Sequence, residues 1–214
     1  MIRIITILFL STSPLLACDF FSDWTLRVPN AEESLKIESL KFYIQELNSN
    51  RLHIDKSFYR RKSNFRKLFG FSFSGADLSA WLNSRIKVFK MGPTGKYIAY
   101  FHDGMVVLGK DFFTLPKVEQ ALVLIHEARH ADGREFTHSK CPEGFPYVSL
   151  RSPKIPLENT EACDDRVDGS YGFGAAFLFE IYAFGLYQTG EERFVLGLYN
   201  SEIARIVIPE SNHF

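Results

Sequence analysis

The segment from Ala121 to His130 constrains this chain more than any other. An apolar run, Ala121–Ile125, leads directly into His126-Glu127-Ala128-Arg129-His130. On an α-helix, residues four positions apart lie one above the other, so the two imidazoles point the same way and can hold one metal ion between them. Glu127 lies beside that face, where its carboxylate can reach a water molecule next to the ion. The segment therefore predicts a helix with one buried face and one reactive face.

Residues on both sides predict where this helix begins and ends. Thr114 is a candidate N-cap, and Pro116 suits the first turn, where a missing N–H costs little. Gly133 is a natural stop shortly after His130. The buried stripe follows helical spacing through Val118, Leu122, Ile125 and Ala128.

The spacing of His126, Glu127 and His130 resembles the HExxH motif of zincins, a class of zinc metallopeptidases. The resemblance covers at most the segment from Lys96 to Tyr187. It implies an α+β, zincin-like fold that is mostly helical, with a small antiparallel sheet preceding the HExxH helix. It also implies one zinc ion held by the two histidines. The expected activity is hydrolysis of a peptide or protein substrate by a zinc-activated water, with Glu127 as the catalytic general base.

A catalytic zinc site needs a third protein ligand, and several residues after the motif are candidates. A metzincin-like pattern would place that ligand at position 136, which is Phe136, so His138 comes two residues late. A gluzincin-like pattern would take Glu161 from a later helix, with Asp164 and Asp168 as further candidates. His138 ranks first because the wider spread of His, Cys, Asp and Gly resembles a group of uncharacterised exported bacterial proteins with an HExxH core.

Three other polar residues are assigned supporting roles. Asp165, one turn after Glu161 on the predicted helix, could accept a hydrogen bond from a liganding imidazole and fix its tautomer. Glu180 interrupts the apolar segment Phe173–Phe184, so its carboxylate is expected to be paired or liganding if buried. Tyr171 is a candidate donor to the oxyanion of the reaction.

The first residues of the chain predict export. Ile4–Leu10 is an apolar run of signal-peptide length, far too short to span a bilayer. The sequence Leu-Leu-Ala-Cys at positions 15–18 resembles a bacterial lipobox. It implies a lipoprotein signal peptide at residues 1–17, a lipidated Cys18, and one zincin-like domain over residues 18–214. The protein is then expected in the cell envelope, lipid-anchored on the extracytoplasmic side of a bacterial membrane. The alternative is an ordinary secretory signal.

The cysteine count fits the lipid anchor. The chain has three cysteines, and lipidation of Cys18 leaves Cys141 and Cys163 as an even pair. In an oxidising compartment these two are expected to form a disulfide. The alternative is that one of them ligates the metal.

Hydrophobic and turn patterns predict the remaining elements. Before the motif they give a helix from Asn30 to about Asn48, a loop or irregular helix over 51–67, and a helix that begins at Ser74. The sheet comprises a strand at Arg85–Lys90 and a hairpin of Lys96–Phe101 with Met105–Leu108. After the motif they give helices from Asn159, over Phe173–Phe184, and from Glu191 to about Val207.

The charge balance argues against a nucleic-acid partner. The chain has 25 basic and 25 acidic residues, and its longest basic run, Arg60-Arg61-Lys62, is interpreted as a solvated face. A rival to the peptidase is a non-catalytic envelope lipoprotein, for binding or scaffolding, with a structural or vestigial metal site. A fourth protein ligand that closes the site would favour this rival.

Overall fold

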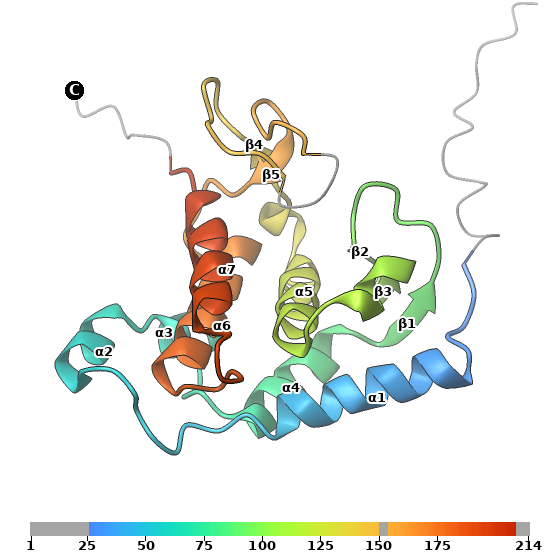
Figure 1. Ribbon diagram of the computed structural model, residues 1–214. Coiled ribbons are helices and arrows are strands. Elements are labelled where there is room, and N and C mark those ends of the chain that lie inside the picture. The colour runs from blue at the N-terminus through green and yellow to red at the C-terminus, as the bar shows by residue number, and fades with distance from the viewer. Residues whose placement is uncertain (1–25, 150–153, 209–214) are drawn as a thin grey trace, which may run out of the picture.

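The computed structural model describes residues 26–149 and 154–208 of the chain (Figure 1). The predicted signal peptide, residues 1–17, and the predicted lipidation site Cys18 lie outside the described residues. The helices are α1 (Ala31–Gln45), α2 (Lys56–Lys62), α3 (Phe65–Phe69), α4 (Gly75–Arg85), α5 (Lys117–His130), α6 (Ser170–Ala183) and α7 (Glu192–Ala204), with 3₁₀ turns η2 (Lys110–Thr114) and η3 (Arg134–Phe136). The strands are β1 (Val88–Met91), β2 (Ala99–His102), β3 (Met105–Leu108), β4 (Ser139–Lys140) and β5 (Glu161–Cys163).

The coarse α+β class is confirmed, but the sheet that precedes α5 is mixed, not antiparallel as predicted. Its strand order is β1-β3-β2, with β2 antiparallel and β1 parallel to β3. The hairpin turns at Asp103-Gly104, both of which have positive φ. The loop over residues 92–98 connects β1 to β2 and leaves a gap one strand wide between them, which β3 fills. Alternation in the sequence reveals the strands but does not choose their neighbours.

Local signals place the helices before the sheet. Asn30 caps α1 in a capping box, in which the Glu33 N–H donates to the Asn30 side chain and the Asn30 N–H donates to the Glu33 carboxylate. Helix α4 begins where the sequence predicted, and the Ser74 side chain caps it. The stretch expected to be a loop or irregular helix, residues 51–67, contains the short helix α2 and the first residues of the short helix α3. An aromatic cluster of Phe65, Phe69, Phe73, Trp81 and Phe173 packs α3 and α4 against α6.

The helix that carries the histidines starts later than predicted. Pro116 occupies the N-cap position of α5 and makes no side-chain capping bond. The predicted cap, Thr114, lies in η2 and donates its hydroxyl to the Asp111 carbonyl. The Thr114 hydroxyl therefore forms its hydrogen bond within the 3₁₀ turn η2 and, contrary to the prediction, does not cap α5. Val118, Ala121, Leu122, Ile125 and Ala128 are buried, as the predicted stripe requires.

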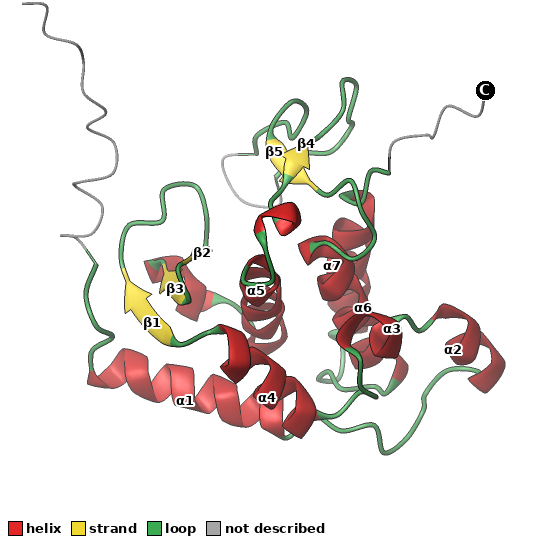
Figure 2. Cartoon of the chain, turned by 180° about the vertical axis from the view of Figure 1, so that it is seen from behind, coloured by secondary structure: helices red, strands yellow, loops and turns green. Residues whose placement is uncertain are grey.

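Helix α6 lies between α5 and α7 at the centre of the molecule (Figures 1 and 2). Thirteen of its residues are buried, which explains its almost continuous apolar sequence. Within the described residues, no helix has the length and apolar character needed to cross a membrane. The β4–β5 sheet forms one end of the molecule, and α1 and α2 lie at the opposite end in both views.

Candidate metal centre

Three histidines converge at the end of α5. His126 and His130 lie one turn apart on this helix, and Gly133, with a φ of 150°, lets the chain reverse direction so that η3 brings His138 back toward them. The Nε2 atoms of His126 and His138 are 2.9 Å apart. The ligand atoms of all three lie within 4.8 Å of one another, and within the described residues this is the group that could hold a metal ion.

Hydrogen bonds fix two of the three rings in the form that a metal requires. His130 Nδ1 lies 2.7 Å from the Phe136 carbonyl oxygen, and His138 Nδ1 lies 2.9 Å from Asp164 Oδ1. Because both partners only accept, each Nδ1 must donate, and in the neutral ring each Nε2 then carries a lone pair. The lone pair of His138 faces His126 Nε2, so the two atoms must share either a proton or a cation. The donor set therefore fits a metal ion.

Burial favours the neutral, metal-binding form of the histidines. Burial first, and then the neighbouring His138 and His130, lower the pKa of His126 well below its ordinary value. Burial followed by His138 lowers the pKa of His130, against smaller opposing effects of Phe136 and Asp164. Neutral imidazoles at physiological pH leave their lone pairs available to a metal ion.

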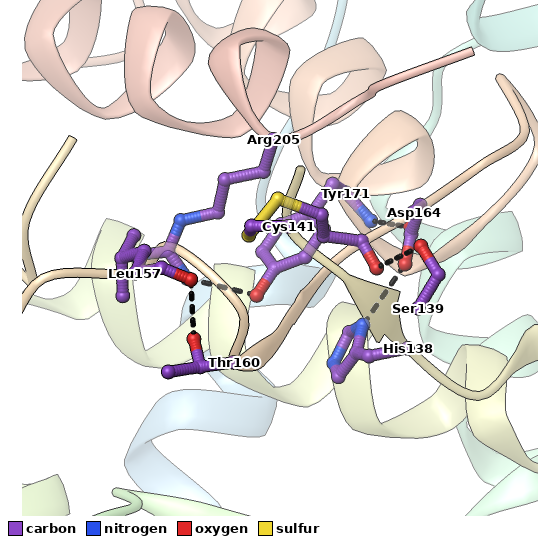
Figure 3. The surroundings of a disulfide bond; sticks show 9 residues. His138, Ser139, Cys141, Leu157, Thr160, Asp164, Tyr171 and Arg205 are labelled. Atoms are coloured by element: carbon purple, nitrogen blue, oxygen red, sulfur yellow. Dashed lines mark hydrogen bonds and ion pairs between the residues drawn. A yellow bond between two sulfur atoms is a disulfide. The ribbon is translucent and has the colours of Figure 1, made fainter. Parts of the chain in front are cut away.

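Asp164 supports His138 from a fixed position. It is 2% exposed, and its second oxygen, Oδ2, accepts a hydrogen bond of 2.9 Å from the Tyr171 backbone N–H. Its own backbone N–H donates to the Arg205 carbonyl, and the Val207 N–H donates to its carbonyl. Figure 3 shows the carboxylate between His138 and Tyr171. Asp164, predicted as a rival ligand, thus fixes the orientation of the His138 ring. Asp165, predicted for that role, is exposed.

The other acidic candidates lie outside the histidine group. The helix predicted from Asn159 is wrong, because Glu161 belongs to strand β5 and is exposed. Asp168 forms an ion pair with Arg166 at 2.6 Å. Pairing of β5 with β4, on a distant segment, overrides the helical pattern of this acidic stretch.

Glu180 is buried and paired, as one of the two predicted alternatives requires. Its carboxylate accepts hydrogen bonds from the Tyr59 hydroxyl at 2.8 Å and the Ser63 hydroxyl at 2.5 Å. These bonds connect α6 to the segment containing α2. Glu180 is therefore a packing residue outside the metal centre.

Glu127 lies on the side of α5 that faces the sheet. It is 7% exposed, and burial raises its pKa to about 8, against a smaller opposing effect of a backbone hydrogen bond from Phe101 on β2. A shallow cavity of about 430 Å³ lies near this strand, lined by Ser84, Arg85, Lys87, Phe101, Gly104, Ala131 and Asp132. Ala131 follows Glu127 by one helical turn, so the cavity lies along the Glu127 side of α5.

Tyr171 forms a wall of the site. Its ring centroid is 4.9 Å from those of His126 and His138, and its hydroxyl accepts a hydrogen bond of 2.8 Å from Arg205. Burial raises the pKa of this hydroxyl. Sequence reasoning proposed Tyr171 as an oxyanion donor and missed Arg205 altogether. No local signal marks Arg205, because it reaches the site from the end of α7.

The disulfide between Cys141 and Cys163 is confirmed, with an S–S distance of 2.01 Å. The alternative, in which one cysteine ligates the metal, is thereby excluded. The bond joins the residue directly after β4 to the last residue of β5, and two residues of the site lie close to it along the chain. His138 precedes Cys141 by three residues, and Asp164 directly follows Cys163. The disulfide therefore ties the third histidine to the acid that orients it.

Comparisons with known proteins give no relative. No protein-family model matches the chain, and neither the curated proteins nor the solved structures contain a match.

Proposed function

We propose that this protein is a zinc-dependent peptidase of zincin-like design, lipid-anchored on the extracytoplasmic side of a bacterial membrane. The observation that carries the proposal is the convergence of His126, His130 and His138, with Glu127 on the adjacent side of the same helix. Three imidazoles suit zinc, and a set of three leaves one coordination position open, which catalysis requires. Within the described residues no fourth acidic, His or Cys ligand completes the group, which favours a catalytic over a structural site.

The chain's own groups have separate roles in this mechanism. Zinc, when bound, supplies Lewis-acid activation of a water molecule and of the scissile carbonyl. His126, His130 and His138 would hold it, and its positive charge would lower the pKa of Glu127 again, so that the Glu127 carboxylate could accept the proton of the attacking water and pass it to the leaving amine.

The edge of the sheet offers a place for the substrate. Because β3 is central, β2 is the outer strand of the hairpin, and its residue Phe101 lies beside Glu127. We propose that an extended peptide pairs with β2, which would place its scissile bond beside Glu127. The cavity next to Phe101 would then accept a side chain of the peptide.

The lipid anchor is supported by the sequence at positions 1–18 and by the disulfide. Disulfides persist in oxidising compartments outside the cytoplasm and are rare inside it.

The test is the substitution Glu127→Gln. We expect this variant to bind zinc with the stoichiometry of wild type and to lose hydrolysis of a casein substrate by about 100-fold or more, because general-base catalysis is worth about 10²–10⁴-fold. Glu143→Gln, an exposed change, is the matched control and should behave as wild type. Full activity of Glu127→Gln would disprove the base assignment.

The zinc content of purified variants distinguishes the proposed ligands from the acidic residues that were considered as alternatives. His126→Ala and His138→Ala should each lose the zinc ion, and Glu161→Ala should keep it. Zinc in a wild type that hydrolyses no substrate would favour the rival function, a non-catalytic envelope lipoprotein.

A further inference from the structure

The segment over residues 51–67 concentrates positive charge. It holds seven basic residues and one acidic residue, which leaves 18 basic and 24 acidic residues in the rest of the chain. All seven basic side chains are exposed: Arg51, Lys56, Arg60, Arg61, Lys62, Arg66 and Lys67. None of them forms an ion pair with another described residue. We call these seven residues the basic patch.

The basic patch has a fixed position on the body. Helix α2, which carries three of these residues at its end, has no buried residue. Its attachment to the rest of the protein therefore depends on side chains that reach α6. The buried Glu180 binds the hydroxyls of Tyr59 and Ser63, and the Tyr59 ring stacks against Phe179 at 6.1 Å. A buried carboxylate left without these partners would be costly, so the contact is strongly maintained.

An apolar line runs along the outer side of α1. On α1, Leu35 and Phe42 are 71% and 65% exposed, and Val28, which precedes the helix, is 68% exposed. Leu35 and Phe42 are seven residues apart, which is close to two helical turns, so their side chains lie on the same side of α1. The opposite side of α1 buries Ile37, Leu40 and Ile44 against the core. Large apolar side chains repeated in this way indicate a contact surface.

The apolar line and the basic patch lie at the same end of the molecule. Figures 1 and 2 are related by a rotation about the vertical axis, and α1 and α2 lie at the lower end in both. The β4–β5 sheet, with His138 directly before β4, lies at the upper end. A flat partner could therefore contact both features without covering the metal centre.

We propose that this end binds the surface of an anionic phospholipid bilayer. Apolar side chains would enter the headgroup region, and the guanidinium and ammonium groups would contact lipid phosphates. The inference rests on the proposed lipid anchor for its geometry. Seven residues separate Cys18 from Leu26, and the eight steps between the two Cα atoms span at most about 28 Å, which holds the start of α1, a helix about 22 Å long, close to the membrane.

The test compares binding of the full chain to vesicles of pure phosphatidylcholine and to vesicles with about 30% phosphatidylglycerol. An anchor or leader would contribute equally to binding of both vesicle types. The ratio of the two affinities therefore measures the contribution of the basic patch. We expect wild type to prefer anionic vesicles at low salt and to lose this preference at high salt, because salt screens exposed charges. Arg60→Gln with Arg61→Gln should reduce the preference by about 25-fold, or about fivefold per charge.

A matched control removes two exposed lysines from the other end, with Lys140→Gln and Lys154→Gln. This variant should keep the preference of wild type. Leu35→Gln with Phe42→Gln should weaken binding to both vesicle types. Equal binding of wild type to the two vesicle types, or an equal loss in the control, would overturn the proposal.

Zinc content and hydrolysis of every variant, measured without vesicles, report the proposed function independently. A variant that loses the lipid preference and keeps zinc and hydrolysis locates the effect at the membrane surface. A competition experiment tests nucleic acid as the partner of the basic patch. If a short double-stranded DNA displaces wild type from anionic vesicles at a lower concentration than soluble phosphatidylglycerol does, the patch binds nucleic acid and the proposal is overturned.

Discussion

Asp164 acts on His138 as the Phe136 carbonyl acts on His130, and each partner fixes which ring nitrogen faces the site. The two oxygens of Asp164 are both used as acceptors, one by His138 and one by the Tyr171 N–H. An asparagine offers only one such oxygen. The charge and one of the two hydrogen bonds would therefore be lost together in Asp164→Asn.

We expect Asp164→Asn to weaken zinc affinity by about 10–100-fold, the usual effect of removing a residue that orients a ligand. Competition with a chromogenic chelator measures this affinity. Asp165→Asn changes an exposed neighbour of the same charge and should leave it unaltered. Equal affinities of the two variants would show that His138 needs no support from Asp164.

Glu202 carries a buried carboxyl group whose Oε2 has no hydrogen-bond partner among the described residues. Burial raises its pKa to about 8, with a lowering by Arg205 and a further raising by Asp164. The ordinary value is 4.5, so the folded state binds a proton more tightly than the unfolded state. This stabilisation is full below about pH 4.5 and is lost as the pH rises to about 8.

Glu202→Gln should therefore flatten the pH dependence of the free energy of unfolding between pH 5 and 8. Wild type should lose stability over this range, and the variant should lose less, because glutamine does not ionise. Denaturant titrations at three pH values measure the difference. Glu192→Gln, an exposed change on the same helix, should retain the wild-type slope. A steeper slope in Glu202→Gln would contradict the assignment.

At the scale of elements, the short β4–β5 sheet depends on its disulfide. The two strands comprise two and three residues, and their cluster of buried apolar residues is Cys141, Leu157 and Cys163. The cysteines are separated by 22 positions, and a bridge of that span is worth about 3 kcal/mol in the chain-entropy model. Because so small a sheet contributes little stability of its own, we expect the disulfide to help hold His138 against Asp164.

Cys141→Ser with Cys163→Ser should lower stability by about 3 kcal/mol and weaken zinc binding more than Glu161→Ala does. Chemical denaturation and zinc titration of both variants measure the two effects. If the disulfide served stability alone, zinc affinity would be unchanged under conditions in which the double variant remains folded.

Local signals could be read from the sequence, and contacts between distant segments could not. Asn30 and Ser74 cap helices through neighbours three residues away, so both helix starts were predictable. The placement of His126 and His130 on one helix was predictable as well, because it depends only on their four-residue spacing. The parallel direction of β1, the strand at Glu161 and the role of Arg205 all depend on partners far along the chain. No periodicity in the sequence carries that information.

At the scale of the whole molecule, the candidate metal centre joins segments that are otherwise separate. Helix α5 supplies two of the three histidines, the segment after η3 supplies the third, and the segment before α6 supplies the acid that hydrogen-bonds to it. A metal ion bound to the folded chain would hold all of them together. Because the unfolded chain lacks this arrangement, zinc binding should stabilise the fold.

The expected size of this stabilisation is about 2.7 kcal/mol when free zinc is 100 times the dissociation constant. For a chain of this length that corresponds to an increase of about 5–10 °C in the midpoint of thermal unfolding. Differential scanning calorimetry with and without zinc measures the shift. His126→Ala should abolish it, whereas His102→Ala, at an exposed histidine of the β2–β3 hairpin, should preserve it. An equal shift in both variants would mean that zinc binds elsewhere, and the convergence of the three histidines would then need an explanation other than a metal.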